Sequence, residues 1–262
     1  MNRIWISISA LAAVCSSASL AYAADMPVKA APVVAAAYDW SGFYGGINGG
    51  GESQKHDWAF NPSIPGAVNQ AFSERVDSAT VGLHVGVQKQ WNQFVFGVEG
   101  GVNDFAGLGF ARHTGYGVDF GSFADMRVKD IYTAGGRVGY AWQNWMFYGS
   151  GGYATGYVST RLVSIATGLE VLGFATSVRQ DGWYAGAGFD YMVMKGQVAD
   201  VILGADYKHV ELDSARHCNN NFISCVVLNT NMHDIRTTVD IVTARLTFKF
   251  NPWGPAAVVA KY

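Results

Sequence analysis

Residues 81–101 read VGLHVGVQKQWNQFVFGVEGG, and this stretch decides the fold class. Val81, Leu83 and Val85 alternate with Gly82 and His84, and the alternation resumes after a short turn at 89–93. A period of two residues is typical of a β-strand whose two faces meet different surroundings. The stretch therefore predicts a β-hairpin with one apolar face and one face of small or polar residues.

The same hairpin pattern returns twice, around turns at 143–144 and 195–196, and no helical periodicity competes with it. We expect eight strands, at 40–51, 78–90, 93–105, 127–142, 145–158, 180–193, 198–212 and 237–250. The connections between hairpins are long and polar, at 52–77, 106–126, 159–179 and 213–236. This alternation predicts an all-β fold: an eight-stranded antiparallel transmembrane β-barrel, an up-and-down meander with short periplasmic turns and four long external loops.

The composition agrees with a membrane location but not with membrane helices. The chain has 262 residues, of which 50% are apolar and only 15% are charged, against about 25% charged in an ordinary soluble domain. After the first 30 residues, no uncharged apolar run reaches the roughly 18 residues that a spanning helix needs. A net charge of −2 and a pI near 6.3 argue against a nucleic-acid-binding protein.

The non-apolar face of the expected strands carries glycine, serine, threonine and a few charges of both signs. Such a face would cover a water-exposed surface poorly, whereas it suits a narrow barrel interior in which acids and bases pair. We expect a lumen charge network of Glu99, Arg137, Asp190, Asp206, Lys208, Arg245 and Lys249. Aromatic pairs near strand ends predict interfacial girdles: Trp40 and Tyr44, Trp91 and Phe94, Trp142 and Trp145, Trp183 and Tyr184.

The N-terminus predicts export. Residues 1–23 have the charge, apolar core and small-residue ending of a signal peptide, with cleavage between Ala23 and Ala24. Lipidation at Cys15 would need a small residue before it, and Val14 is not small. The division expected is a signal peptide at 1–23, an Ala/Pro-rich periplasmic leader at 24–39, the barrel at 40–250 and a C-terminal extension at 251–262.

Two cysteines remain in the mature chain, Cys218 and Cys225. In an exported protein a close pair of this kind predicts a disulfide, which would stabilise the fold by about 2–3 kcal/mol. A metal site built with His209, His217 and His233 is the alternative, and its spacing matches no zinc pattern.

Two segments carry a family resemblance: YDWSGFYGG at 38–46 and VTARLTFKF at 242–250. With the leader, they resemble the small outer-membrane immunogenic or porin-like β-barrel proteins of alphaproteobacteria. The resemblance implies the outer membrane of a Gram-negative cell and a last strand whose aromatics, Phe248 and Phe250, are read as an assembly signal. The extension 251–262 departs from the family, because such chains usually stop at the terminal aromatic. Pro252 and Pro255 forbid simple continuation of the last strand. Either Phe250 is an internal assembly signal, or Tyr262 is an alternative terminal aromatic.

These observations favour a structural and surface-interaction protein, a surface antigen whose lumen is largely filled by side chains. No catalytic motif, cofactor or metal is expected, nor a nucleic-acid partner. The expected partners are outer-membrane lipid and lipopolysaccharide, the barrel assembly machinery, and host or surface ligands of the loops; the oligomeric state is not predicted. Two alternatives remain: a narrow passive pore, and loop-based haem or ligand binding by histidines drawn from His84, His113, His209, His217 and His233. A wide general porin is excluded, because it needs about 16 strands.

Overall fold

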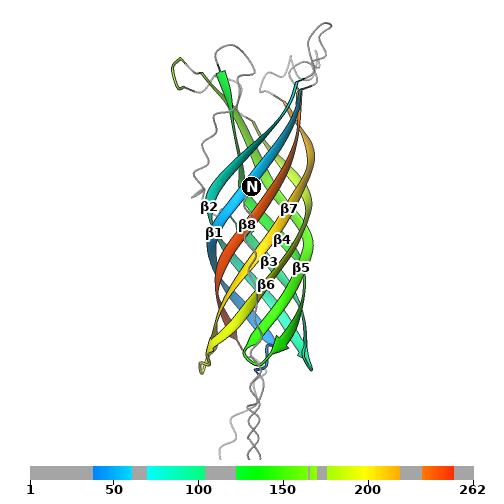
Figure 1. Ribbon diagram of the computed structural model, residues 1–262, viewed down its shortest axis with the longest axis vertical. Coiled ribbons are helices and arrows are strands. Elements are labelled where there is room, and N and C mark those ends of the chain that lie inside the picture. The colour runs from blue at the N-terminus through cyan, green and yellow to red at the C-terminus, as the bar shows by residue number, and fades with distance from the viewer. Residues whose placement is uncertain are drawn as a thin grey trace, which may run out of the picture. The chain divides into compact units, whose positions relative to one another are not determined.

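The computed structural model describes residues 38–60, 70–103, 122–164, 166–169, 176–218 and 232–250. The elements in these ranges are eight strands: β1 Gly42–Phe60, β2 Gln70–Trp91, β3 Phe94–Asn103, β4 Ser122–Trp142, β5 Trp145–Ser164, β6 Thr176–Met194, β7 Ala199–Cys218 and β8 Met232–Phe250. Each pairs antiparallel with the next, and β8 returns to β1, which confirms the predicted eight-stranded closed barrel (Figure 1). Within the same ranges, no helix is long and apolar enough to cross a membrane.

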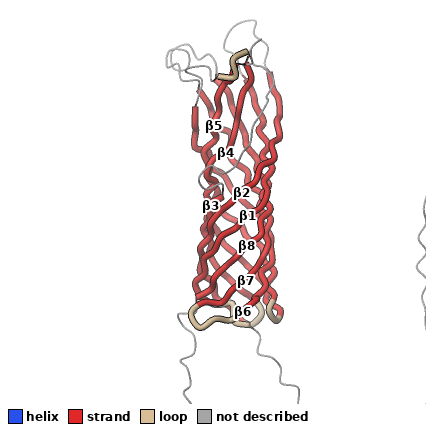
Figure 2. Tube along the Cα trace, turned by 90° about the vertical axis from the view of Figure 1, so that its left-hand side faces the viewer, coloured by secondary structure: helices blue, strands red, loops and turns tan. Residues whose placement is uncertain are grey.

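The two ends of the barrel differ. At one end, hereafter the short-turn end, residues 92–93, 143–144 and 195–198 join neighbouring strands (Figure 2). Asn92 and Gln143 have φ angles of 54° and 55° there, the left-handed conformation that tight hairpin turns use. The opposite end, where the longer connections lie, is hereafter the long-loop end.

The strands are longer than the sequence predicts. Seven of the eight have 19 to 22 residues, and only β3 has 10. Large parts of the connections expected at 52–77, 159–179 and 213–236 are therefore strand. The reason lies in the polarity of these segments: most of their outward residues are charged or polar, and several inward residues, such as Gln54 and His56, are polar too, so the segments resemble loops.

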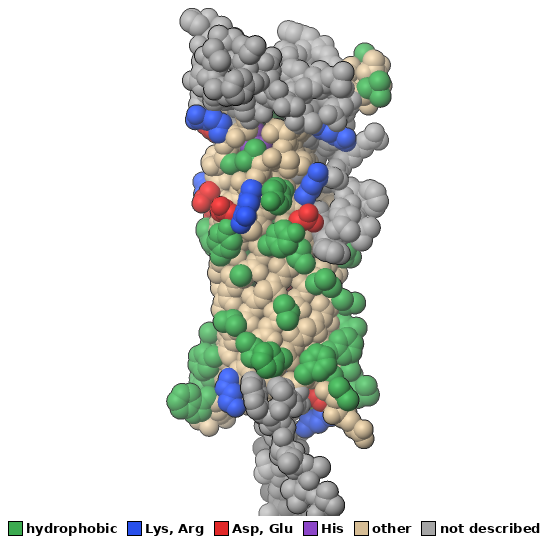
Figure 3. Space-filling view, turned by 180° about the vertical axis from the view of Figure 1, so that it is seen from behind, with side chains coloured by type: hydrophobic (Ala, Val, Ile, Leu, Met, Phe, Trp, Pro, Cys, Tyr) green, Lys and Arg blue, Asp and Glu red, His purple; other side chains and the backbone are tan. Residues whose placement is uncertain are grey.

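An apolar band surrounds the barrel near the short-turn end. On β8 the outward residues from Phe250 to Val242 are apolar, with Phe250 45% and Val242 58% exposed. This length is close to the roughly 9–11 residues that a tilted strand needs to cross the lipid. Figure 3 shows apolar side chains spread over this part of the surface, with charged side chains gathered above it and a few at the short-turn end.

Above the band the outward residues become charged. On β8 they continue as Asp240, Thr238, Arg236 and Asp234, and ion pairs join Arg236 to Glu211 and Asp234 to Arg216. We call the part with the apolar outer face the lower half and the part with the charged outer face the upper half. On β8 the boundary falls between Val242 and Asp240.

The girdle prediction is partly wrong. Trp91, Phe94 and Trp142 are outward and more than half exposed at the short-turn end, and Trp183 is outward at the upper edge of the band. Trp40, Tyr44 and Tyr184 lie inside the barrel instead, with exposures of 0%, 2% and 3%. Tyr44 and Tyr184 face the lumen because they alternate with outward neighbours on β1 and β6. Trp40 precedes β1 and is held in the barrel mouth, where its carbonyl accepts a hydrogen bond from Gln88.

Candidate functional site

The lower half of the lumen is centred on Glu99, which points inward from β3 and is 8% exposed. Its carboxylate accepts a hydrogen bond from Arg245 at 2.6 Å and one from the hydroxyl of Tyr44 at 3.0 Å. Arg137 approaches the same carboxylate at 3.4 Å and Lys208 at 3.8 Å. One acid therefore holds together side chains from four other strands.

Two further acids complete this arrangement. Asp206 pairs with Arg245 at 2.9 Å and with Lys208 at 3.3 Å, and Asp190 pairs with Arg137. The lumen network, defined as Glu99, Asp190, Asp206, Arg137, Lys208 and Arg245, contains three acids and three bases. Its formal charge is zero, which is the condition under which buried charges are tolerated.

Aromatic rings and glycines fit around the charges. The guanidinium of Arg137 lies 3.6 Å from the centre of the Tyr148 ring, a cation–π contact, and Arg245 donates to the Tyr148 hydroxyl at 3.1 Å. A Cβ added at Gly188 would lie 2.6 Å from that hydroxyl, and one at Gly86 would lie 2.4 Å from the hydroxyl of Tyr44. Glycine at these inward positions makes room for the two tyrosines.

Lys249 does not join the lumen network, although the sequence groups it there. It lies nearer the short-turn end and pairs with Asp200 at 3.5 Å. The hydroxyl of Tyr38 donates to the same carboxylate at 2.6 Å, and the Tyr38 ring packs edge-on against Trp40 at 4.9 Å. The buried residues of this mouth layer are Tyr38, Trp40, Val95, Ala141, Met146, Tyr148, Met192 and Ile202.

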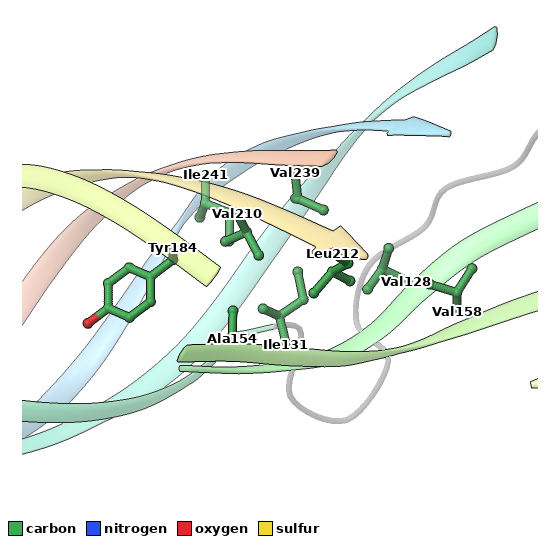
Figure 4. Close-up of a cluster of buried hydrophobic side chains, with 9 residues drawn as sticks. All are labelled: Val128, Ile131, Ala154, Val158, Tyr184, Val210, Leu212, Val239 and Ile241. Carbon is green, nitrogen blue, oxygen red and sulfur yellow. The ribbon is translucent and has the colours of Figure 1, made fainter. Parts of the chain in front are cut away.

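An apolar layer fills the lumen above the charges. It consists of Val128, Ile131, Ala154, Val158, Tyr184, Val210, Leu212, Val239 and Ile241, none more than 3% exposed. Figure 4 shows these side chains converging from strands on facing sides of the barrel. This layer lies in the upper half, where the outer face is charged.

A polar layer follows towards the long-loop end. Gln54 donates to Glu52 at 2.6 Å, His56 and Thr237 lie within 3.1 Å, and Gln180 donates to the carbonyl of Ile235 at 3.0 Å. From the short-turn end upward, the interior thus holds an aromatic mouth layer, the ionic network, an apolar layer, and a polar layer that partly overlaps the apolar one, since Glu52 and Gln54 are opposite Ile241 and Val239. The alternation of polar and apolar residues predicts the ionic network but not the other three layers.

The histidine side chains that the structure describes do not converge on one site. His84 contacts Thr247 at 2.8 Å inside the lower lumen, whereas His209 lies on the outer face against Asp240 at 2.8 Å. His217 is buried near Gln180 in the polar layer. Among the side chains that the structure describes, no group of three His, Cys, Asp or Glu residues could hold a metal ion.

Several predicted features fall outside the described residues. These are Ala23 and Ala24, Cys225, His113, the side chains of Cys218 and His233, and the extension 251–262. Phe248 and Phe250 are described: both point outward at the short-turn end of β8, 40% and 45% exposed.

Comparison with known proteins gives one family. The model described as "Outer membrane protein beta-barrel domain" matches residues 8–250. No curated protein matches the sequence.

Among solved structures, the chain resembles Ail, the attachment invasion locus protein of Yersinia pestis, with 14% identity and a TM-score of 0.37 over 79% of this chain and 99% of that one. It also resembles OprG from Pseudomonas aeruginosa, with 14% identity and a TM-score of 0.39 over 80% and 97% of the two chains. The outer membrane protease OmpT from Escherichia coli has 9% identity and a TM-score of 0.40 over 80% and 97%. Nothing about the role of the present chain follows from likenesses this weak.

Proposed function

Because the chain belongs to the outer membrane protein β-barrel family, we propose that it is a sealed barrel with a structural and surface-interaction role. The apolar band anchors it in the bacterial outer membrane. The short-turn end faces the periplasm, and the long-loop end carries the loops and the charged upper half outside the cell. No residue is assigned a catalytic role.

The observation that carries this proposal is the filled lumen. Eight strands enclose an interior just wide enough for side chains, and here buried side chains occupy it from the mouth layer to the polar layer. An ion crossing the barrel would have to separate the pairs around Glu99 and then pass the apolar layer at Leu212 and Val239. Each step removes a charge from its partners or places it against hydrocarbon, which is costly.

The narrow pore is the second candidate, and the same geometry opposes it. A path would open only if Arg137 or Arg245 left its carboxylates and the apolar layer also moved. Haem capture has less support, because the described histidines lie on different faces of the barrel.

Export and assembly complete the proposal. Cleavage between Ala23 and Ala24 would release the mature chain, and Phe248 and Phe250 would present the assembly signal at the periplasmic rim. A Cys218–Cys225 disulfide would constrain the loop after β7. Lipopolysaccharide, the assembly machinery and external ligands of the loops are the proposed partners.

Single-channel conductance in a planar bilayer tests the proposal. The mature chain is refolded, a heat-dependent gel shift confirms folding, and current is recorded after insertion. We expect no discrete openings, and none from the control variant Lys55→Ala, whose ion pair with Asp57 lies on the outer face. Steady openings of the native chain would overturn the sealed barrel in favour of the pore.

A further inference from the structure

The outer face changes from apolar to charged at a similar level on β6 and on β8. On β6 the outward residues pass from Phe189 and Ala187 to Trp183 and then Asp181. On β8 they pass from Val242 to Asp240. The side chains at this level meet the boundary between hydrocarbon and lipid headgroups, where amphipathic aromatics are favoured.

Among the residues that the structure describes, the half-exposed aromatics at this boundary lie on the side of the barrel formed by β4 to β7. Tyr132, Tyr153, Trp183 and Tyr207, between 44% and 46% exposed, come from the successive strands β4, β5, β6 and β7. On β1 the corresponding outward residues are Gly49 and Gly51. A general interfacial girdle would surround the barrel, so an uneven distribution indicates a more specific contact.

Carboxylates are fixed among these aromatics. Asp181 accepts a hydrogen bond from the hydroxyl of Tyr153 at 2.5 Å and pairs with Arg179 at 3.3 Å. Asp240 accepts one from the hydroxyl of Tyr207 at 2.7 Å and lies 2.8 Å from a ring nitrogen of His209.

The ring of His209 in turn lies 5.8 Å from that of Trp183. We call this set the boundary patch: Tyr153, Arg179, Asp181, Trp183, Tyr207, His209 and Asp240. Its polar groups hold one another in place before any ligand arrives.

A shallow apolar strip lies directly below the boundary patch. Gly151 is opposite Ala185, and Gly149 is opposite Ala187, all four pointing outward from β5 and β6. A Cβ added at Gly149 would have its nearest neighbour at 3.9 Å, so barrel packing does not require glycine there. The strip leaves room against the barrel wall for a straight hydrocarbon chain.

We propose that the boundary patch binds the saccharide headgroup of an outer-leaflet glycolipid of the lipopolysaccharide type, whose acyl chain lies along the strip. The aromatic faces offer apolar area to sugar C–H groups, the carboxylates accept hydrogen bonds from sugar hydroxyls, and Arg179 pairs with a phosphate. Groups that suit the headgroup and a surface that suits the acyl chain thus lie next to each other on the outer face of the barrel. The assignment rests on the proposed orientation, with the long-loop end outside.

Binding is measured with the refolded full barrel in detergent micelles, from the fluorescence anisotropy of labelled lipopolysaccharide. Labelled phosphatidylglycerol, an anionic lipid without a sugar, is titrated in parallel. We expect Trp183→Leu to weaken lipopolysaccharide binding by about tenfold and Asp240→Asn by about fivefold. The parent should bind phosphatidylglycerol more weakly than lipopolysaccharide.

Each variant has a matched control elsewhere on the surface. Trp91→Leu removes an exposed tryptophan at the short-turn end, and Asp57→Asn removes a carboxylate whose side chain is 42% exposed, close to the 40% of Asp240. Both should bind like the parent, within about twofold. Equal binding of the two lipids, or unchanged binding by Trp183→Leu and Asp240→Asn, would overturn the proposal.

Orientation is tested separately, so that the two failures are distinguishable. Thr167, exposed in the connection after β5, is replaced by cysteine and whole cells are treated with a membrane-impermeant maleimide. Labelling above the level of the parent chain supports the long-loop end outside. Labelling only after cell lysis would overturn that orientation, whatever the binding assay returned, and with it the assignment to the outer leaflet.

Discussion

The lower and upper halves of the barrel have opposite polarity. In the lower half the outer face is apolar and the lumen holds a neutral network of six charges around Glu99. In the upper half the outer face carries ion pairs such as Arg179–Asp181, and the lumen holds an apolar layer around Leu212 with polar but mostly uncharged side chains such as Gln54 beside it. The difference shows that strand geometry does not decide which face of a strand is apolar. In each half, the medium outside the barrel decides where the apolar residues lie.

Strand β7 carries the inversion without any break. Its inward residues are Asp206 and Lys208, followed by Val210 and Leu212. The pairing of β7 with β8 continues in register from Ala199 to Leu212, past the point of inversion. The inward residues therefore change from charged to apolar through residue type alone, without a change in the strand pairing or in the alternation of the two faces.

A physical reason exists for a charged lower lumen. If both faces of the lower strands were apolar, each strand would be a continuous run of apolar residues. Two such strands joined by a short turn would approach the length of apolar sequence that is typical of a membrane-spanning helix. Polar inward residues avoid such runs, and pairing them makes their burial tolerable. The upper half meets water outside, so its lumen can hold an apolar cluster next to hydrogen-bonded polar side chains.

The largest expected effect comes from breaking the lower network. Arg245→Ala leaves Glu99 and Asp206 with one fewer basic partner in a buried site, and we expect it to lower the free energy of unfolding by about 3–5 kcal/mol. The measurement is urea unfolding of the barrel in phospholipid vesicles, followed by tryptophan fluorescence. Arg236→Ala, which breaks an exposed pair on the same strand, should cost at most about 1 kcal/mol.

A charge-balanced double variant sharpens this prediction. Glu99→Met combined with Arg245→Met removes one acid and one base together, and it should be more stable than Arg245→Ala. Equal costs for Arg245→Ala and Arg236→Ala would show that the lumen network contributes no more than a surface pair.

The second test places the same charge on the outer face of each half. Ala244 lies in the apolar band on β8, and Thr238 lies on the same face of the same strand above it. We expect Ala244→Arg to destabilise the membrane-inserted barrel by about 2–4 kcal/mol and Thr238→Arg by about 1 kcal/mol or less. Similar values for the two in vesicles would mean that the hydrocarbon boundary does not lie between them.

Alternation alone was enough to predict eight strands and a closed meander, because the 81–101 pattern repeats with short turns. Strand length was underestimated for a specific reason. In segments such as 213–236, charged residues such as Asp234 and Arg236 suggest a loop, but the residues between them, such as Ile235, are buried. The alternation continues there with inverted polarity, and this signal could have extended the strands.

The candidate site was predictable in part. Arg137, Asp190 and Arg245 face the lumen because they alternate with outward residues, and opposite charges in a dry interior must pair. The role of Tyr44 could not be read in this way, since a tyrosine near a strand end fits a girdle equally well. Its inward direction depends on the barrel register, and its contact with Glu99 on another strand depends on closure.

The smallest expected effect concerns the outer charges of the upper half. A hydrogen bond from Ser73, and the nearby Lys55 ammonium at 3.0 Å, lower the pKa of Asp57 below its usual value. A group whose pKa is lower in the folded state stabilises the fold above its unfolded pKa of about 3.9, and the stabilisation is lost as the pH falls through the folded pKa.

Asp57→Asn should therefore cost at most about 1 kcal/mol at neutral pH, and the difference from the parent should shrink as the pH falls below the unfolded pKa of about 3.9 and through the lower folded pKa. Because both partners are about two-fifths exposed, high salt should also reduce the difference. Urea unfolding at several pH values and salt concentrations measures both trends. If the loss of unfolding free energy stayed constant with pH and salt, Asp57 would act through packing and not through its charge. The outer charges of the upper half would then stabilise the barrel in the same way as the apolar surface below them.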